Sequence, residues 1–227
     1  MSMKRVFKTA FVDTLPVMTG YMVLGFGFGV VMSANGFSPL FTAAMSLFVF
    51  AGSMQYAAIP LLTAATPLMT LALTTLMVNA RHLFYGVSML EKYKNTGRKK
   101  PYLIFALTDE TYSLVCHDRE GLEEAQRQDY YLLVSLLDQF WWVLGSVLGA
   151  AAGTLISFNS EGVDFALTAL FITVFAEQWL SGKKHTGALV GLAASIGCLA
   201  LFGSDKFLIP AMLVIAAVLT LKKEEEA

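Results

Sequence analysis

Charge is scarce in this sequence. Asp, Glu, Lys and Arg make up 15% of its 227 residues and leave a net charge of −1. A protein that binds nucleic acid carries a basic stripe or patch, whereas the few basic residues here lie between apolar runs. We therefore expect no nucleic acid among the partners of this chain.

Residues and motifs that build catalytic or metal sites are also few. The chain has two cysteines, Cys116 and Cys198, and three histidines that lie far apart, so neither a disulfide framework nor a metal site is indicated. It contains no GxxxxGK(S/T) loop for ATP and no HExxH or GxSxG motif. We expect neither an enzyme nor a bound cofactor.

Apolar residues, by contrast, make up 56% of the chain, and the mean hydropathy is +0.61. Such a composition indicates an integral membrane protein embedded in a lipid bilayer. A helix needs about 20 apolar residues to cross the hydrocarbon. Stretches near or above that length lie at 14–34, 39–65, 67–90, 130–157 and 163–181, with shorter ones at 187–203 and 207–221. The sequence predicts an all-α, polytopic membrane helix bundle of seven or eight spans.

Residues 91–129 form the plainly polar segment. It opens with the basic EKYKNTGRKKP and closes with the largely acidic HDREGLEEAQRQD. The stretch YLIFALTDETYSLVC between them predicts a surface helix, a half-helix that dips into a cavity, or an eighth span. With seven spans the positive-inside rule places 91–129 in the cytoplasm and the N-terminus outside; with eight it places both termini inside and residues 91–101 outside. Both versions predict a cytoplasmic C-terminus.

The polar segment divides a single predicted membrane domain, residues 1–227, into halves at 10–90 and 130–221. When Asp13 is laid on Asp138, the halves show weak similarity, which Gly- and Ala-rich helix composition would equally produce. In this alignment NARH at 79–82 falls on SDKF at 204–207, so a polar interruption recurs. Such interruptions are typical of transporters built from inverted repeats, in which broken helices surround a site at the midplane.

Arg81 lies inside an apolar run, TTLMVNARHLFYG. An arginine on a lipid-facing helix centre costs from about 3 to over 10 kcal/mol, so Arg81 is expected to face protein, water or an anion. It precedes Glu91 by about 15 Å of helix, which is too far for easy snorkelling. Two roles remain. Arg81 binds a substrate carboxylate with Asn79 and Gln55 as polar neighbours, or it forms a structural ion pair with an acid such as Asp138.

A second candidate feature is FVFAGSMQYA at 48–57, in which Gly52 and Ser53 interrupt an apolar run just before Gln55. A helix break at this point would free backbone groups that bind the charged ends of a ligand. The alternative is that these small residues only allow helices to pack closely.

Three acids are candidates for proton coupling: Asp138, which lies deep in its apolar run, and the adjacent Asp109 and Glu110. Removal from water favours the neutral form of a carboxyl group, which suits a proton carrier. Asp13 is expected instead to cap the first helix.

Five stretches of the sequence resemble the AzlC-like large subunits of branched-chain amino-acid exporters. They are FVDTLPVMTGYMVLGFGFGVVMSANGFSP, SLFVFAGSMQYAA, VNARHLFYG, TDETYSL and GVDFALTALFITVF. The resemblance implies efflux of valine, leucine, isoleucine and often methionine across a bacterial inner membrane, together with a small AzlD-like membrane subunit. It also implies functional roles for Ser53, Gln55, Asn79, Arg81, His82, Asp109 and Glu110.

The residues themselves fit a secondary transporter of amino acids. A zwitterion needs a cation or helix N-terminus for its carboxylate, an acid or carbonyl cluster for its ammonium, and an apolar pocket for its side chain. Two other classes remain open: a passive channel, and a membrane scaffold for a partner subunit.

Overall fold

The computed structural model describes residues 3–117, 119, 121–155 and 185–203, with short pieces of chain between 172 and 221. Its contacts divide the chain into two compact units, residues 1–167 and 168–227, and each is described by itself. The regular secondary structure of the described residues is helical. In the first unit the helices are α1 (Met3–Ala34), α2 (Pro39–Phe48), α3 (Gly52–Thr63), α4 (Leu68–Val78), α5 (Arg81–Met89), η1 (Gly97–Lys99), α6 (Lys100–Phe105), α7 (Asp109–Val115) and α8 (Glu124–Leu155).

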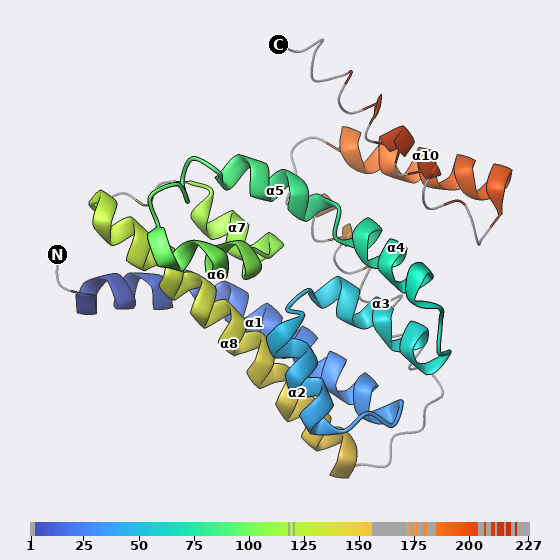
Figure 1. Cartoon of the computed structure of the whole chain (residues 1–227), viewed down its shortest axis with the longest axis horizontal. Helices are drawn as coiled ribbons and strands as arrows, with labels where there is room; N and C mark the ends of the chain where they lie inside the picture. Colours follow the sequence, from blue (N-terminus) through green and yellow to red (C-terminus); the bar gives the residue numbers. More distant parts are fainter. Residues whose placement is uncertain are drawn as a thin grey trace. The chain divides into compact units, whose positions relative to one another are not determined.

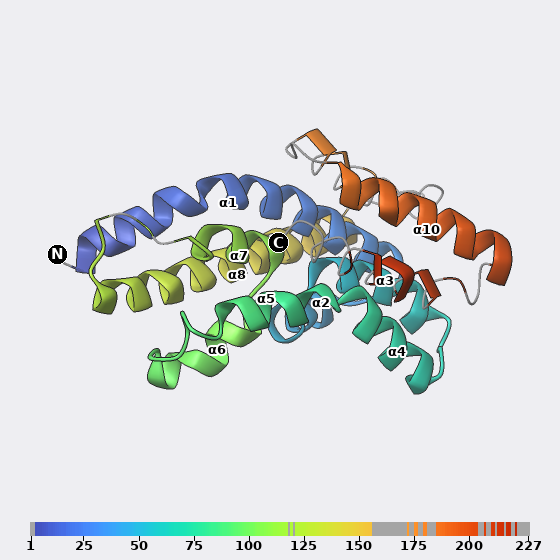
Figure 2. The same cartoon turned by 90° about the horizontal axis from the view of Figure 1, so that it is seen from above.

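The long helices α1 and α8 pack side by side and run in the same direction (Figures 1 and 2). Near their starts, the Tyr130 hydroxyl donates a hydrogen bond to Asp13 at 2.8 Å. Further along, a methyl group placed on Gly25 would lie 3.1 Å from the backbone nitrogen of Ser146. Because the contacts advance together along both helices, residue 3 and residue 124 lie at the same end of this unit.

Both helices are long and apolar enough to cross a membrane, by length and composition. They match the expected spans at 14–34 and 130–157. Exposed apolar side chains also indicate a membrane protein: Leu40 and Leu68 are 81% and 82% exposed. Large apolar patches of this kind are covered by lipid or by partner proteins.

The stretch 39–65 does not form the single crossing that we expected. It holds two short helices, α2 and α3, of 10 and 12 residues, and each is too short to span about 30 Å of hydrocarbon. Between them, the ring of Phe50 packs against Tyr21 near the middle of α1. Tyr56 on α3 then donates to the carbonyl of Leu24, which lies closer to the end of α1. The pair is therefore a re-entrant hairpin that returns toward the end where α1 finishes.

A second re-entrant hairpin, α6 and α7, enters from the opposite direction. Lys99 pairs with Asp129 near the start of α8, and the Tyr102 hydroxyl donates to Gln139, further along α8, at 2.7 Å. At the end of α7, the backbone carbonyl of Val115 accepts from Lys92 at 3.5 Å, so the hairpin returns to the segment that precedes η1. These two short helices resemble one of the alternatives expected from the sequence, a half-helix that dips inward.

A pair of helices, α4 followed by α5, connects the two hairpins. It begins just after α3 and ends at Met89, which belongs to the same core cluster as Val6 and Tyr130. The tips of the two hairpins meet in the middle, where the rings of Phe50 and Phe105 lie 6.4 Å apart.

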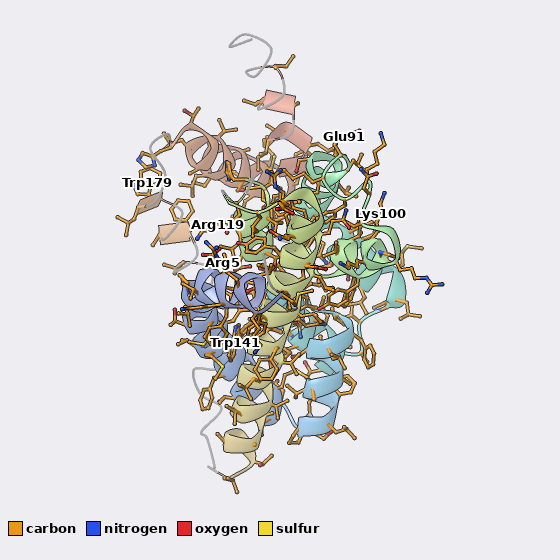
Figure 3. The ribbon with its side chains drawn as sticks, turned by 90° about the vertical axis from the view of Figure 1, so that its left-hand side faces the viewer. Arg5, Glu91, Lys100, Arg119, Trp141 and Trp179 are labelled. Carbon is orange, nitrogen blue, oxygen red and sulfur yellow. The ribbon has the colours of Figure 1, made fainter. Side chains whose placement is uncertain are left out.

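We call the end of this unit where α1 and α8 begin the basic end. Figure 3 looks onto this end, where Arg5, Glu91, Lys100 and Arg119 are labelled. Tyr93 and Leu122 pack there in one cluster with Val6, so both sides of the segment 91–123 lie at the basic end together with the start of α1. The N-terminus therefore lies at the same end of this unit as residue 124, and residues 91–101 lie at that end too.

In the second unit the structure describes α10 (Thr186–Phe202), which matches the apolar stretch expected at 187–203. Most of the stretches expected at 163–181 and 207–221 lie outside the described residues, as do Ser204, Asp205 and Lys206 of the repeated interruption and the C-terminal KKEEEA.

Candidate functional site

Three helix interruptions lie together in the first unit, and each carries polar residues singled out from the sequence. They fall between α2 and α3, between α4 and α5, and between α6 and α7. Arg81 is the first residue of α5, and Asp109 is the first residue of α7. Ser53 is the second residue of α3.

Arg81 joins all three interruptions. One guanidinium nitrogen donates to the hydroxyl of Ser53 at 3.0 Å, and another lies 3.0 Å from a carboxylate oxygen of Asp109. The side chains of Arg81 and Asp109 are 39% and 31% exposed, whereas the two paired atoms, Arg81 Nε and Asp109 Oδ1, are themselves buried. The acid that pairs with Arg81 is thus Asp109 rather than Asp138.

The interruption before α3 combines an unusual backbone conformation with a close helix contact. Phe50 has a φ of +41°, a backbone conformation that residues other than glycine rarely adopt. Two residues later, a methyl group on Gly52 would lie 2.9 Å from the ring of Trp142 on α8. The close approach of Trp142 therefore requires a glycine at this position, and no side chain caps the amide groups at the start of α3.

Gln55 is engaged away from Arg81. Its side-chain oxygen accepts from the indole N–H of Trp142 at 2.9 Å, and its amide nitrogen donates to Ser46 at 3.3 Å. Gln55 and Ser46 are fully buried. The contacts of Gln55 are those of a structural polar group that holds α2, α3 and α8 together.

Asn79 and His82 lie at the interruption before α5. A ring nitrogen of His82 lies 3.1 Å from the backbone carbonyl of Asn79, and the His82 ring meets Tyr85 edge-on. The side-chain oxygen of Asn79 is buried and has no hydrogen-bond partner among the described residues. It is a free acceptor close to Arg81 in the chain, which suits a ligand ammonium group.

The two other acids are bound by hydroxyl groups. Glu110 accepts from Tyr21 at 2.7 Å, and Asp138, which is fully buried, accepts from Thr111 at 2.7 Å. The second oxygen of Asp138 has no partner among the described residues. Sequence reasoning did not single out Tyr21 and Thr111, although both lie within stretches that carry the family resemblance.

Asp13, which we expected to cap a helix, instead ties the basic end together. It accepts from Tyr130 and pairs with Arg119 at 3.0 Å. A metal site is not apparent: the described residues contain no group of three or more His, Cys, Asp or Glu side chains placed to hold an ion.

The amino-acid sequence is similar to those of known proteins. The family model described as AzlC protein matches residues 16–156. A Bacillus subtilis relative named branched-chain amino acid transport protein AzlC is 44% identical over 218 residues, which cover 96% of this chain and 85% of the relative. A Helicobacter pylori relative named as an uncharacterized membrane protein is 38% identical, with 98% and 97% covered. The Escherichia coli inner membrane protein YgaZ is 27% identical, with 91% and 84% covered. No solved structure matches the chain.

Proposed function

The chain belongs to the AzlC family, and from that premise we propose that it exports branched-chain amino acids across the inner membrane as the large subunit of a two-subunit, proton-coupled secondary transporter. The observation that carries the proposal is the position of Arg81, at the start of a helix and between Ser53 and Asp109 of two other helix interruptions. Free backbone groups and a fixed pair of opposite charges at such interruptions suit a zwitterionic substrate.

Substrate binding would exchange partners in the Arg81–Asp109 pair. The substrate carboxylate takes the guanidinium of Arg81, supported by Ser53 and the uncapped amides that begin at Gly52. The substrate ammonium takes Asp109, with the free oxygen of Asn79 as a second acceptor. The substrate carboxylate then takes the place of Asp109 beside Arg81, and the substrate ammonium takes the place of Arg81 beside Asp109. Because the substrate carries no net charge, the site remains neutral.

The substrate side chain would contact the aromatic residues around the hairpin tips. Phe50 and Phe105 meet there, and Tyr85 stacks on Tyr112 with ring centroids 4.6 Å apart. One methylene changes binding to an apolar pocket by only about 1–3 kcal/mol, so such a surface accepts valine, leucine, isoleucine and methionine together.

The distribution of basic residues supports a cytoplasmic basic end and N-terminus. Lysines and arginines lie on α1 before Thr9 and again after Leu90, whereas residues 9–80, which include the turns at the opposite end, contain none. The positive-inside rule places the basic side in the cytoplasm. The inverted relation of the halves and a cytoplasmic C-terminus remain part of this proposal. Because 39–65 is a hairpin, the seven apolar stretches would supply six crossings.

Proton coupling would supply enough driving force. One charge moving through about 100 mV provides about 2.3 kcal/mol, which sustains roughly a fifty-fold substrate gradient. Three acids could carry the proton: Asp109, Glu110 and Asp138. Asp109 already forms an ion pair with Arg81.

Reconstitution tests the proposal. The chain is incorporated into proteoliposomes with and without the AzlD-like subunit, and flux of labelled valine is measured under an imposed pH gradient. We expect valine to accumulate against its gradient only when both subunits are present. Equilibration without accumulation indicates a passive channel, and no flux in either preparation indicates a scaffold. Full export by the chain alone removes the second subunit from the mechanism.

A further inference from the structure

Five side chains on three helices form an unbroken series of hydrogen bonds between two acids. The hydroxyl of Tyr21 on α1 lies 2.7 Å from Glu110 and 2.7 Å from the hydroxyl of Thr108. Thr108, the residue that caps α7, lies 3.1 Å from the hydroxyl of Thr111. Thr111 reaches Asp138 on α8 at 2.7 Å. The interior of the series is closed to water, since Tyr21 is 4% exposed and Thr111 and Asp138 are fully buried.

Counting hydrogens shows that this series needs a carboxyl proton. It contains four oxygen-to-oxygen contacts of hydrogen-bond length, and each needs one hydrogen between its oxygens. The hydroxyls of Tyr21, Thr108 and Thr111 supply one hydrogen each. The backbone N–H of Thr111 also points at the Thr108 hydroxyl oxygen, at 3.2 Å, but adds nothing to the four contacts. The fourth hydrogen must come from a carboxyl group, so at least one of Glu110 and Asp138 is protonated.

The two arrangements of that proton are both complete. With the proton on Glu110, each hydroxyl donates toward Asp138; with the proton on Asp138, each hydroxyl donates toward Glu110. Thr108 accepts two hydrogen bonds and donates one in both cases, which uses its hydroxyl fully. Neither arrangement leaves a contact without a hydrogen.

We propose that Glu110 and Asp138 share one proton and exchange it along the hydroxyls of Tyr21, Thr108 and Thr111 during transport. This inference rests on the proposed proton-coupled function and identifies the path of its proton. In one transfer Glu110 gives up a proton, each hydroxyl passes its own proton to the next oxygen and receives another, and Asp138 gains one. No hydroxyl changes its charge, and the three hydroxyls rotate back before the next transfer.

The neighbouring charges connect this exchange to the substrate. Asp109 and Arg81 lie beside Glu110, and the hydroxyls of Tyr102 and Tyr130 are the other titratable groups close to Asp138. Glu110 directly follows Asp109, so it is the acid of this series that lies beside the Arg81–Asp109 pair. When a substrate separates Arg81 from Asp109, the site stays neutral but the charges beside Glu110 are rearranged. The position of the shared proton along the series responds to that rearrangement.

The first test compares two tyrosines that are equally buried. Tyr21→Phe removes one hydroxyl of the series, whereas Tyr56→Phe removes a hydroxyl that donates to the backbone of Leu24; both side chains are 4% exposed. In proteoliposomes we measure net valine transport driven by a pH gradient, and exchange of labelled for unlabelled valine at equal pH. Exchange needs no net proton movement. We expect Tyr21→Phe to lower net transport at least about tenfold while exchange stays near the parental rate. Tyr56→Phe should leave the ratio of the two rates unchanged.

Threonine variants provide a second comparison at the other end of the series. Thr111→Ser keeps the hydroxyl and should keep net transport, whereas Thr111→Val should behave as Tyr21→Phe. If Tyr21→Phe and Thr111→Val leave the ratio of net transport to exchange at the parental value, the proton does not use this path and the inference is overturned.

A measurement without transport separates this inference from the proposed function. Infrared spectra of the purified protein at neutral pH should show the band of one protonated carboxyl group. Glu110→Gln and Asp138→Asn should each abolish that band completely, since either amide can supply the fourth hydrogen. No band in the parental protein, or a band that only one of the two substitutions removes, overturns the shared proton. If the parental protein transports no amino acid, the proposed function fails and the infrared result alone decides the inference.

Discussion

Arg81 on α5 and Asp109 on α7 form an ion pair of 3.0 Å in which each charge belongs to the first residue of its helix. The sequence places both beside helix interruptions, but their pairing depends on the hairpin α6–α7, which carries Asp109 from the basic end to the middle of the unit. An ion pair that is already formed presents both charges that an amino acid requires.

Substitution of Arg81 should abolish transport and leave the fold intact. A lysine keeps the charge but cannot hold a carboxylate through two parallel hydrogen bonds, so Arg81→Lys should reduce valine transport at least about tenfold. Because the pair with Asp109 is partly exposed, its loss should cost only about 0–1 kcal/mol of stability. Valine binding and thermal unfolding, measured on Arg81→Lys and Arg81→Ala, check both statements.

Two outcomes would change this account. If Arg81→Ala folds poorly and Asp109→Asn restores its stability, the arginine has a structural role. If Arg81→Ala binds and exports valine at the parental rate, the arginine has neither a structural role nor a role in substrate binding.

Substitution of Gln55 should affect stability rather than substrate binding. Gln55→Met removes the acceptor of the Trp142 indole and the donor to Ser46, and leaves two buried polar groups without partners. Each such group costs about 1–3 kcal/mol. We expect a lower melting temperature with an unchanged Kd for valine. A weakened Kd with parental stability would return Gln55 to the substrate site.

A methyl group between α1 and α8 should disrupt their packing. At Gly149 it would collide with the backbone of Phe26, which cannot move without separating the helices. Overpacking costs about 1–3 kcal/mol or more, so Gly149→Ala should lower both membrane yield and melting temperature. Gly20→Ala is the matched control, because nothing lies within 4 Å of a methyl group placed there. Equal behaviour of the two variants would contradict this packing.

The re-entrant hairpins make a prediction about topology. In a chain with Cys116→Ser and Cys198→Ala, single cysteines are introduced as Lys4→Cys, Asn95→Cys and Gly36→Cys. An impermeant thiol reagent added outside cells should label only the Gly36 variant, since positions 4 and 95 lie at the basic end and 36 follows the end of α1. Labelling of position 95 together with 36 would make α6–α7 a crossing.

The C-terminus gives a separate topological test. A reporter that is active only in the cytoplasm, fused after Ala227, should be active. Activity of a periplasm-only reporter at that position would place the C-terminus outside and contradict both topologies derived from hydropathy.

Hydropathy and composition determined that this chain is a bundle of membrane helices, because the bilayer requires long apolar segments whose backbone groups are satisfied internally. The cost of burying charge determined that Arg81 faces protein or substrate rather than lipid. Hydropathy reports only which solvent a segment prefers, so it could not distinguish a crossing from the hairpin that residues 39–65 form. Only the tertiary structure decided that Arg81 pairs with Asp109 and that the Trp142 indole donates a hydrogen bond to Gln55. It also decided that Tyr21, Thr108 and Thr111 link Glu110 to Asp138. These contacts join residues far apart in the chain, and hydrogen-bond geometry depends on angstrom-scale helix placement that no local pattern of residues encodes.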